Sequence, residues 1–309
     1  MRSKILVTGS GGLLGYALKE LLPEAVFVTS RDFDLVDICN VKRLFDEAKP
    51  AHVIHLAAKV GGVKKNASSN ADLFTANIQI NTNVLNVAQE HQVSRLISVL
   101  SSCAFPTYIE HPSTESDLHA DMPFKGNLGY GYSKRMLDIQ TKLLWEQYGS
   151  HFSTITPATM YGPNDNWDLE SGHVVGSLVH KCYLAKQRSK PFTVWGSGNA
   201  VRQFVYSYDI AQLIIQALGV FNGPETLIVT PDSGNTIKDL VSVIAEAMDF
   251  TGEIIFDQMK PEGQLVRRLE SRSFKDQFPN FHFTSLKQGL ALTAAWFHEN
   301  NYVALEKVK

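Results

Sequence analysis

A short apolar run followed at once by closely spaced glycines, near the start of the chain, restricts the fold more than any other feature. Ile5 to Val7 precede Gly9, Gly12 and Gly15, and the leucines that come next have helical spacing. Strand, glycine-rich turn and helix in this order are typical of a phosphate site, because a helix N-terminus offers free N–H groups. We expect Gly9 to allow a tight turn, Gly12 the approach of a pyrophosphate, and Gly15 close packing of helix on strand. The spacing is GxxGxxG rather than GxGxxG, so an ordinary strand–helix turn is the alternative.

The alternation of strand and helix patterns continues through the first half of the chain. Strand patterns alternate with helical ones in the order 25–28, 41–49, 52–56, 72–91, 96–100, 130–148 and 152–156. This order predicts an α/β fold, a doubly wound parallel sheet of the Rossmann type with helices on both faces. Past residue 160 the elements are shorter and mixed, and a strand near 226–229 is among them. We therefore expect a Rossmann domain at 1–160, to which a segment near 200–220 returns, and a smaller α+β C-terminal substrate domain at 161–309.

The composition excludes several classes of partner. The chain has 309 residues and a net charge of −2, which argues against nucleic acid or an anionic membrane as the main partner. Cys39, Cys103 and Cys182 are odd in number and far apart, so they offer neither a disulfide framework nor the spacing of a metal site. No stretch has the pattern of a signal peptide or of a membrane span. We expect a cytoplasmic protein without a bound metal.

The residues that follow the second strand indicate which dinucleotide is bound. An acidic residue at the strand tip binds the ribose hydroxyls of NAD, whereas an arginine binds the 2′-phosphate of NADP. This chain has Ser30 and Arg31 at the tip, which favours NADP(H), although Asp32 one position later complicates the choice. After the third strand, Ala57 and Ala58 are small enough for the backbone to approach the cofactor.

A tyrosine and a lysine four residues apart suggest an acid–base pair. If a helix begins near Tyr130, its side chain and that of Lys134 lie on one face. A lysine cation one turn away favours the phenolate, so we expect it to lower the tyrosine pKa from its ordinary value of about 10. Cys103 follows the strand at 96–100 and is a candidate thiolate base. Such pairs also arise by chance, and a lone cysteine is more often a small buried apolar residue.

Several features, taken together and in this order, resemble the extended short-chain dehydrogenase/reductases, which act mostly on nucleotide sugars. They are the glycine turn, Ser101, the Tyr130–Lys134 pair, the loop 161–163, and the run from Trp195 through Arg202 to Asp209. In that family a serine, a tyrosine and a lysine form the catalytic triad, which the resemblance places at Ser101, Tyr130 and Lys134. It implies cofactor contacts at Gly9, Gly12, Leu13, Leu14, Gly15, Arg31, Ala57, Ala58, Tyr130 and Lys134.

Two details narrow the activity within that family. A sugar-nucleotide dehydratase has Asp and Glu directly after the triad residue, whereas this chain has Ser102 and Cys103 there. Further runs resemble the branch that epimerises and reduces GDP-4-keto-6-deoxy-D-mannose, namely 101–106, 164–166, 172–174, 194–198, 260–264 and 293–297. Thr159 departs from the asparagine usual in that branch, which puts one hydrogen bond to substrate or loop in doubt.

The resemblance to this branch implies a role for each site residue. Ser101 and Tyr130 hydrogen-bond the ketone oxygen, and NADPH reduces the ketone carbon while Tyr130 protonates the oxygen. Inverting a carbon requires one group to remove a proton and another to deliver one on the opposite face. The resemblance assigns Cys103 as that base and His173 as that acid. It implies that the GDP-sugar is bound by Asn164, Val174, Trp195, Arg202 and Arg267.

The resemblance also implies a homodimer through a four-helix interface, formed by the helices near 72–91 and 131–149 of two copies. Apolar residues on the second helix fit this interface or the core of one chain. Two other functions stay open: another nucleotide-sugar epimerase or reductase, and a non-catalytic nucleotide-binding regulator on the same fold. The complete set of acid–base residues disfavours the regulator, since a binding module has no use for two such groups beside a ketone.

Overall fold

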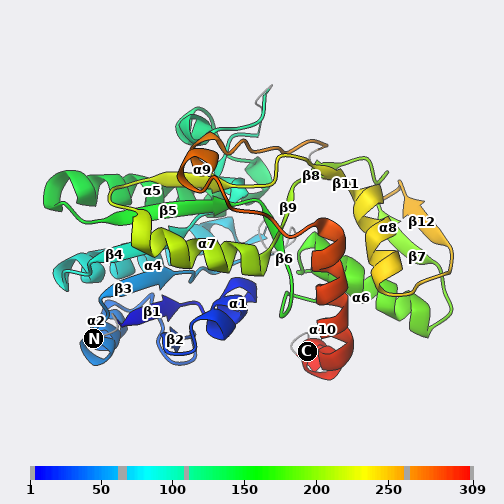
Figure 1. Ribbon diagram of the computed structural model, residues 1–309, viewed down its shortest axis with the longest axis horizontal. Helices are drawn as coiled ribbons and strands as arrows, with labels where there is room; N and C mark the ends of the chain where they lie inside the picture. The colour runs from blue at the N-terminus through cyan, green and yellow to red at the C-terminus, as the bar shows by residue number, and fades with distance from the viewer. Residues whose placement is uncertain (1–3, 62–67, 108–110, 261–264, 307–309) are drawn as a thin grey trace.

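A six-stranded parallel sheet forms the centre of the larger part of the molecule (Figure 1). Its strands lie in the order β10 (Thr226–Val229), β5 (Phe152–Pro157), β4 (Arg95–Val99), β3 (His52–His55), β1 (Ile5–Thr8) and β2 (Val26–Val28). The computed structural model describes residues 4–61, 68–107, 111–260 and 265–306, so most of the 260–264 run lies outside the described residues. The parallel sheet confirms the doubly wound α/β fold predicted from the sequence.

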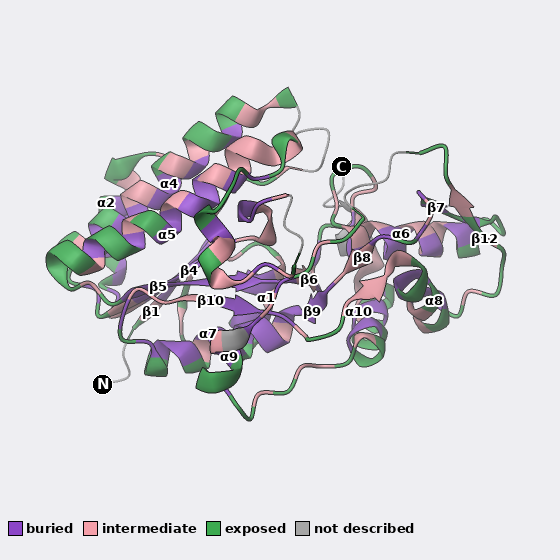
Figure 2. Ribbon diagram, turned by 90° about the horizontal axis from the view of Figure 1, so that it is seen from above, coloured by how far each residue is buried: buried purple, intermediate pink, exposed green. Residues whose placement is uncertain are grey.

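Helices cover both faces of the sheet (Figure 2). One face carries α2 (Ile38–Ala48), α4 (Asn70–Glu90) and α5 (Leu128–Tyr148), and the other carries α1 (Leu13–Leu21), α7 (Ser207–Val220) and α9 (Arg272–Gln277). Successive side chains of a strand point to opposite faces, so Leu6 and Val53 join one apolar cluster while Val7 and Ile54 join the other. Within the described residues, no helix has the length and apolar character needed to cross a membrane.

The local sequence explains where a helix such as α2 begins and which face it buries. The side chain of Asp37 accepts a hydrogen bond from the Cys39 backbone nitrogen at 2.9 Å, which caps the first turn. The apolar residues then recur at helical spacing and are buried against the sheet: Val41, Leu44, Phe45 and Ala48.

The smaller part of the molecule has its own apolar core. Three helices, α6 (Val174–Gln187), α8 (Ile237–Ala247) and α10 (Leu286–Glu306), pack around buried aromatic residues that include Trp167, Phe192 and Phe297. Short strands pair two by two: β7 (Phe192–Trp195) with β12 (Ile254–Asp257), β8 (Val201–Arg202) with β11 (Asn235–Thr236), and β6 (Thr159–Tyr161) with β9 (Phe204–Tyr206). In the described residues between β4 and α5 lie the 3-10 turns η1 (Ser102–Ala104), η2 (Glu115–His119) and η3 (Lys125–Asn127).

The chain returns to the sheet after the smaller part has begun. α7 packs against α1, and β10 pairs with β5 at the edge of the sheet, where buried Leu227 lies opposite buried Ile155. Placing 226–229 in the smaller part was therefore wrong, because a four-residue apolar strand carries no information about its partner strand. The sheet is assembled from two separate stretches of sequence.

The strand order sets the position of a ligand site. From β1 the chain passes to β2 on one side and then to β3 on the other, with α1 and α2 on opposite faces. In doubly wound sheets, ligands bind beyond the carboxyl ends of the strands at such a reversal. Here that position is the edge where the glycine turn after β1 meets the segment after β3.

Candidate active site

A cavity of about 630 Å3 opens beyond the carboxyl ends of β1, β2, β3, β4 and β5. Many of the residues predicted from the sequence line it, namely Gly9, Gly12, Leu13, Leu14, Gly15, Ala57, Ala58, Ser101, Cys103, Tyr130, Lys134, His173 and Arg267. Thr159, the departure from the family pattern, lines it as well. The structure thus brings all five catalytic candidates, and every cofactor-binding candidate except Arg31, into one cavity.

Steric requirements explain the glycine turn that follows β1. Gly9 has φ +72°, and a Cβ there would lie 2.5 Å from the Ala57 backbone nitrogen. A Cβ on Gly15 would lie 2.5 Å from the Cα of Ser10, so a side chain would push α1 off the turn. At Gly12 the nearest atom to such a Cβ is 3.9 Å away, which leaves open space. Gly12 also begins α1 without a side-chain cap, so the N–H groups of the first turn can bind an anion.

The turn after β2 closes through Asp32. Its Oδ2 accepts hydrogen bonds from the backbone and the hydroxyl of Thr29, both at 2.8 Å, and these bonds lower the pKa of Asp32. The carboxylate is therefore engaged within its own turn. Arg31 is exposed and is not among the residues that line the cavity, whereas Asp34, which the sequence reasoning passed over, is one of them. Contact between Arg31 and a 2′-phosphate stays a prediction.

The turn after β4 presents Cys103 to the cavity. Ser101 caps η1, and its Oγ accepts a hydrogen bond from the Cys103 backbone nitrogen at 3.2 Å. Arg135 of α5 donates from Nε to the carbonyl of Ala104 at 2.5 Å. Gly131 lets α5 come this close, because a Cβ there would lie 2.8 Å from the Cys103 carbonyl oxygen. The cysteine is thus positioned by the same helix that carries the tyrosine and the lysine.

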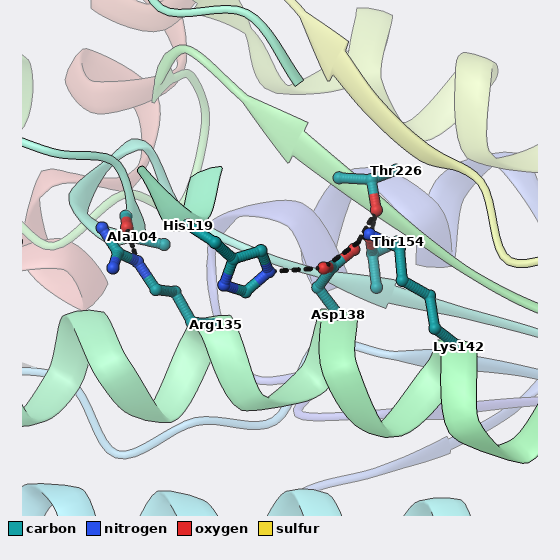
Figure 3. Close-up of polar contacts among 7 residues, drawn as sticks. All are labelled: Ala104, His119, Arg135, Asp138, Lys142, Thr154 and Thr226. Carbon is teal, nitrogen blue, oxygen red and sulfur yellow. Dashed lines mark hydrogen bonds and ion pairs between the residues drawn. The ribbon is translucent and has the colours of Figure 1, made fainter. Parts of the chain in front are cut away.

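A buried carboxylate anchors α5 one turn beyond Lys134 (Figure 3). Asp138 accepts a hydrogen bond from Thr226 of β10, and its Oδ2 lies 2.7 Å from His119 Nε2 and 2.9 Å from Lys142 Nζ. Burial by itself raises the pKa of a carboxyl group, but these partners outweigh burial and the pKa of Asp138 is lowered. The helix is therefore tied both to the sheet edge and to η2.

Tyr130 and Lys134 lie on successive turns of α5, which begins two residues before the tyrosine. Lys134 is buried, its Nζ donates to the Val99 carbonyl at 2.8 Å, and burial lowers its pKa to about 8. The pKa of Tyr130 is raised, mainly by loss of hydration and to a smaller extent by the nearby Cys103. A hydrogen bond with Ser101 acts in the opposite direction and is outweighed. The expected lowering by Lys134 was wrong for this arrangement, because the ammonium is directed at Val99 and loss of hydration dominates. At neutral pH Tyr130 is a phenol that can donate a proton.

His173 enters the cavity from the smaller part of the molecule. It is the N-cap residue of α6, its side chain is 62% exposed, and its Nδ1 lies 3.5 Å from Asp165 Oδ1. The hydrogen bond with Asp165 raises the pKa of His173 above its ordinary value and outweighs loss of hydration. Arg267 comes from the same part and places Nη1 3.5 Å from Cys103 Sγ. Cys103 and His173 thus reach one cavity from different parts of the chain.

The remaining substrate candidates lie outside the set of residues that line this cavity. Asn164 donates to the carbonyls of the glycine turn, at 3.4 Å to residue 11 and 3.5 Å to residue 12. Val174 is the first residue of α6, and Arg202 of β8 donates from Nη1 to the Val201 carbonyl at 2.7 Å. Their contacts with a substrate stay predictions.

Two lysines that the sequence reasoning did not assign to the site flank Trp195. The Nζ of Lys181 lies 4.5 Å from the centre of the Trp195 rings, and that of Lys260 lies 5.9 Å away. Half of the Trp195 surface is exposed. Lys181 follows Val174 by seven residues and so lies on the same face of α6, a spacing that could have indicated it.

Comparison with known proteins matches residues 5–229 to the NAD dependent epimerase/dehydratase family. The chain is 37% identical over 305 residues to the GDP-L-fucose synthase of Dictyostelium discoideum, covering 96% of this chain and 95% of that protein. It is 34% identical over 313 residues to a probable GDP-L-fucose synthase of Drosophila melanogaster, covering 96% and 98%. A solved GDP-L-fucose synthetase from Naegleria fowleri bound to NADP has a TM-score of 0.91 and 34% identity, covering 97% of this chain and 94% of that one.

Proposed function

The chain belongs to the NAD dependent epimerase/dehydratase family, and on this basis we propose that it converts GDP-4-keto-6-deoxy-D-mannose to GDP-L-fucose with NADP(H) as cofactor. The reaction comprises two epimerisations beside the ketone and then hydride reduction of the ketone. One observation carries the proposal: a single cavity contains a reductase set, Ser101, Tyr130 and Lys134, together with an acid–base pair, Cys103 and His173. Similarity over nearly the whole length to GDP-L-fucose synthases supports the choice of substrate.

The cavity residues fit the dinucleotide. The open space at Gly12 and the uncapped first turn of α1 suit a pyrophosphate. Ala57 and Ala58 line the cavity with small side chains, and Arg31 is the proposed partner of the 2′-phosphate. The chemistry that NADP(H) supplies when bound is a hydride for the ketone carbon. Lys134 of α5, which is buried and hydrogen-bonded to Val99 at the end of β4, is the proposed ligand of the nicotinamide ribose.

The epimerisations follow from the acidity that a ketone confers on the hydrogens of the adjacent carbons. The hydroxyls of Ser101 and Tyr130 donate hydrogen bonds to the ketone oxygen and stabilise the enolate charge. Cys103, as the thiolate, removes a proton from one face, and His173, as the imidazolium, delivers a proton to the opposite face. The raised pKa of His173 favours its proton-carrying form. The same pair serves both carbons, since each lies beside the same ketone.

The reduction requires a proton donor at the ketone oxygen. Tyr130 is suited to this task because its pKa is raised, so that it carries its proton at neutral pH. Lys134, with a pKa near 8, is the adjacent group that can return a proton to the tyrosine afterwards. A non-catalytic regulator has no need of these proton-transferring residues. The similar proteins favour neither a regulator nor another nucleotide-sugar epimerase or reductase.

The test is incubation of the purified chain with GDP-4-keto-6-deoxy-D-mannose and NADPH. We expect NADPH to be oxidised in amounts equal to the GDP-L-fucose formed, as identified by chromatography and NMR of the sugar. GDP-mannose, which has no ketone, is the control substrate and is expected to leave NADPH unchanged. Absence of both NADPH oxidation and GDP-L-fucose would refute the proposal.

We further propose a homodimer in which α4 and α5 of two copies form a four-helix interface. These helices pack side by side, and their exposed apolar residues include Phe74 of α4 and Ile139 and Leu143 of α5. The last two are four residues apart and therefore lie on one face of the helix.

Sedimentation measurements on variants test this interface. Leu143→Lys places an unpaired charge in it, so we expect the dimer dissociation constant to rise at least about tenfold. Val220→Lys, an equally exposed position on α7, is the control and should leave the mass of the particle unchanged. A wild-type chain that sediments at its single-chain mass would contradict the dimer.

The cytoplasm is the compartment we propose. Cys39, Cys103 and Cys182 are all free, which suits a reducing compartment. Fractionation of cells that express the chain tests this assignment.

A further inference from the structure

Asp165 contacts the side chain of His173 but is not one of the residues that line the cavity. Its side chain is 1% exposed, and its Oδ1 lies 3.5 Å from His173 Nδ1 and accepts a hydrogen bond from the Asn166 backbone at 2.7 Å. Within the described residues, Oδ2 is buried without a hydrogen-bond partner. Burial of a polar oxygen without a partner costs free energy, so a carboxylate kept at this position requires an explanation.

Packing fixes the turn that carries Asp165. A Cβ on Gly176 of α6 would lie 2.5 Å from the Asn166 carbonyl oxygen and 3.3 Å from the Asp165 Cγ, so the turn rests directly on the helix. Trp167 is buried in the core of the smaller part, and its carbonyl accepts a hydrogen bond from His180 Nδ1 at 2.7 Å. The carboxylate therefore holds its place beside the first turn of α6.

We propose that Asp165 is a positioning residue for the His173 acid, engaging Nδ1 so that Nε2 is the nitrogen that delivers a proton to the substrate. This inference rests on the proposed function, because His173 has that task only in an epimerisation. An acceptor on one ring nitrogen fixes both the tautomer and the orientation of an imidazole. The fixed turn supplies such an acceptor from outside the cavity.

The proton balance of the step is complete within the chain. Cys103 takes a proton from the carbon and becomes a thiol, and the pair of electrons passes to the ketone as an enolate. His173 then gives its Nε2 proton to the opposite face of that carbon and becomes neutral. Exchange with solvent restores the thiolate and the imidazolium before the second carbon reacts.

Other ionisable groups share the cavity with His173, namely Asp34, Lys59, Cys103, Tyr130, Lys134 and Arg267. The pKa of His173 is raised by Asp165, first through the hydrogen bond and further through its charge, while loss of hydration acts in the opposite direction. Removing the charge of Asp165 therefore lowers the pH up to which His173 stays protonated.

The experiment compares the full-length wild type with Asp165→Asn. We expect the pKa of His173, followed by NMR of its ring protons, to be lower in the variant than in the wild type. The kcat for epimerised product should fall about ten- to a hundredfold, below the range for loss of a general acid itself. The alkaline limb of its pH profile should move to lower pH, because the rate needs protonated His173. Affinity for NADPH should be unchanged, and Asp165→Glu should restore part of the kcat.

Asp168→Asn is the matched control. Asp168 belongs to the same turn but accepts hydrogen bonds from the backbone of Glu170 and Ser171, at 3.1 Å and 2.6 Å. This variant should therefore leave the pKa of His173 and its pH profile as in the wild type.

Two results would overturn the inference. One is an Asp165→Asn enzyme that binds NADPH but keeps the wild-type pKa of His173 and the wild-type rate. The other needs no variant: His173 of the wild type titrating at or below the ordinary value of about 6.5. The titration also separates this inference from the proposed function, since the pKa of His173 and its dependence on Asp165 are measured without turnover, whereas the function is tested by the formation of GDP-L-fucose.

Discussion

The two walls of the cavity are built in different ways. The nucleotide wall, formed by the segments 9–15, 28–35 and 56–60, presents backbone and mostly small or apolar side chains directly after three strands. The reaction wall, formed by Ser101, Cys103, Tyr130, Lys134, His173 and Arg267, presents functional side chains. Arg267 and Cys103, for example, are 164 residues apart in the sequence.

This difference determines which changes each wall tolerates. The nucleotide wall depends on the space that glycines and small side chains leave for packing and for the cofactor. Adding a methyl group there is therefore expected to disturb its structure more than shortening a side chain. The reaction wall depends on functional side chains, so truncating Cys103, Tyr130 or His173 is expected to abolish chemistry while the cofactor still binds. Three variants test this contrast, in addition to Asp165→Asn.

The largest effect is expected for Tyr130→Phe. Removing the hydroxyl deletes the proton donor for the ketone oxygen but leaves the ring, so NADPH oxidation should slow by about 10²- to 10⁴-fold. The dissociation constant for NADPH, measured by fluorescence titration, should stay within a few-fold of the wild type. A rate within tenfold of the wild type would show that Tyr130 is not the donor.

A smaller but substantial effect is expected for Gly9→Ala. An alanine at position 9 must adopt φ +72°, and its Cβ would lie 2.5 Å from the Ala57 backbone nitrogen. The unfavourable backbone angle and the steric clash together lower the unfolding free energy by about 2 to 5 kcal/mol. Urea denaturation measures this loss. Gly11→Ala is the control, because the nearest atom to its Cβ is 3.6 Å away, and it should change the unfolding free energy by less than about 1 kcal/mol. Equal stability of both variants would contradict the steric account of the turn.

The smallest effect is expected for Arg31→Ala, a change in the turn beside the nucleotide wall that removes a charge and adds no atoms. Loss of one charge-assisted hydrogen bond at an exposed site should weaken NADPH binding about tenfold. Binding of NADH, which lacks the 2′-phosphate, should change little. Equal weakening of both cofactors would remove Arg31 from the role of 2′-phosphate ligand.

Most of the fold could be predicted from the sequence, because strand, turn and helix signals act over a few residues. The pairing of β10 with β5 could not be predicted, since the apolar pattern of 226–229 would be the same beside any other buried strand. The five catalytic candidates were identified by their motifs. Asp165 and Lys181 were missed, because an aspartate in a turn and a lysine on a helix are common and their partners are defined by tertiary contacts.

The sequence by itself determined the parallel sheet and the glycine turn and indicated the candidate acid–base residues, since these signals depend on neighbouring positions in the chain. The tertiary structure alone decided their protonation behaviour and their neighbours. Burial, and not the nearby lysine, controls the pKa of Tyr130, and Asp165 controls that of His173. Hydration and the distance between charges set a pKa, and both quantities exist only when distant segments have packed together.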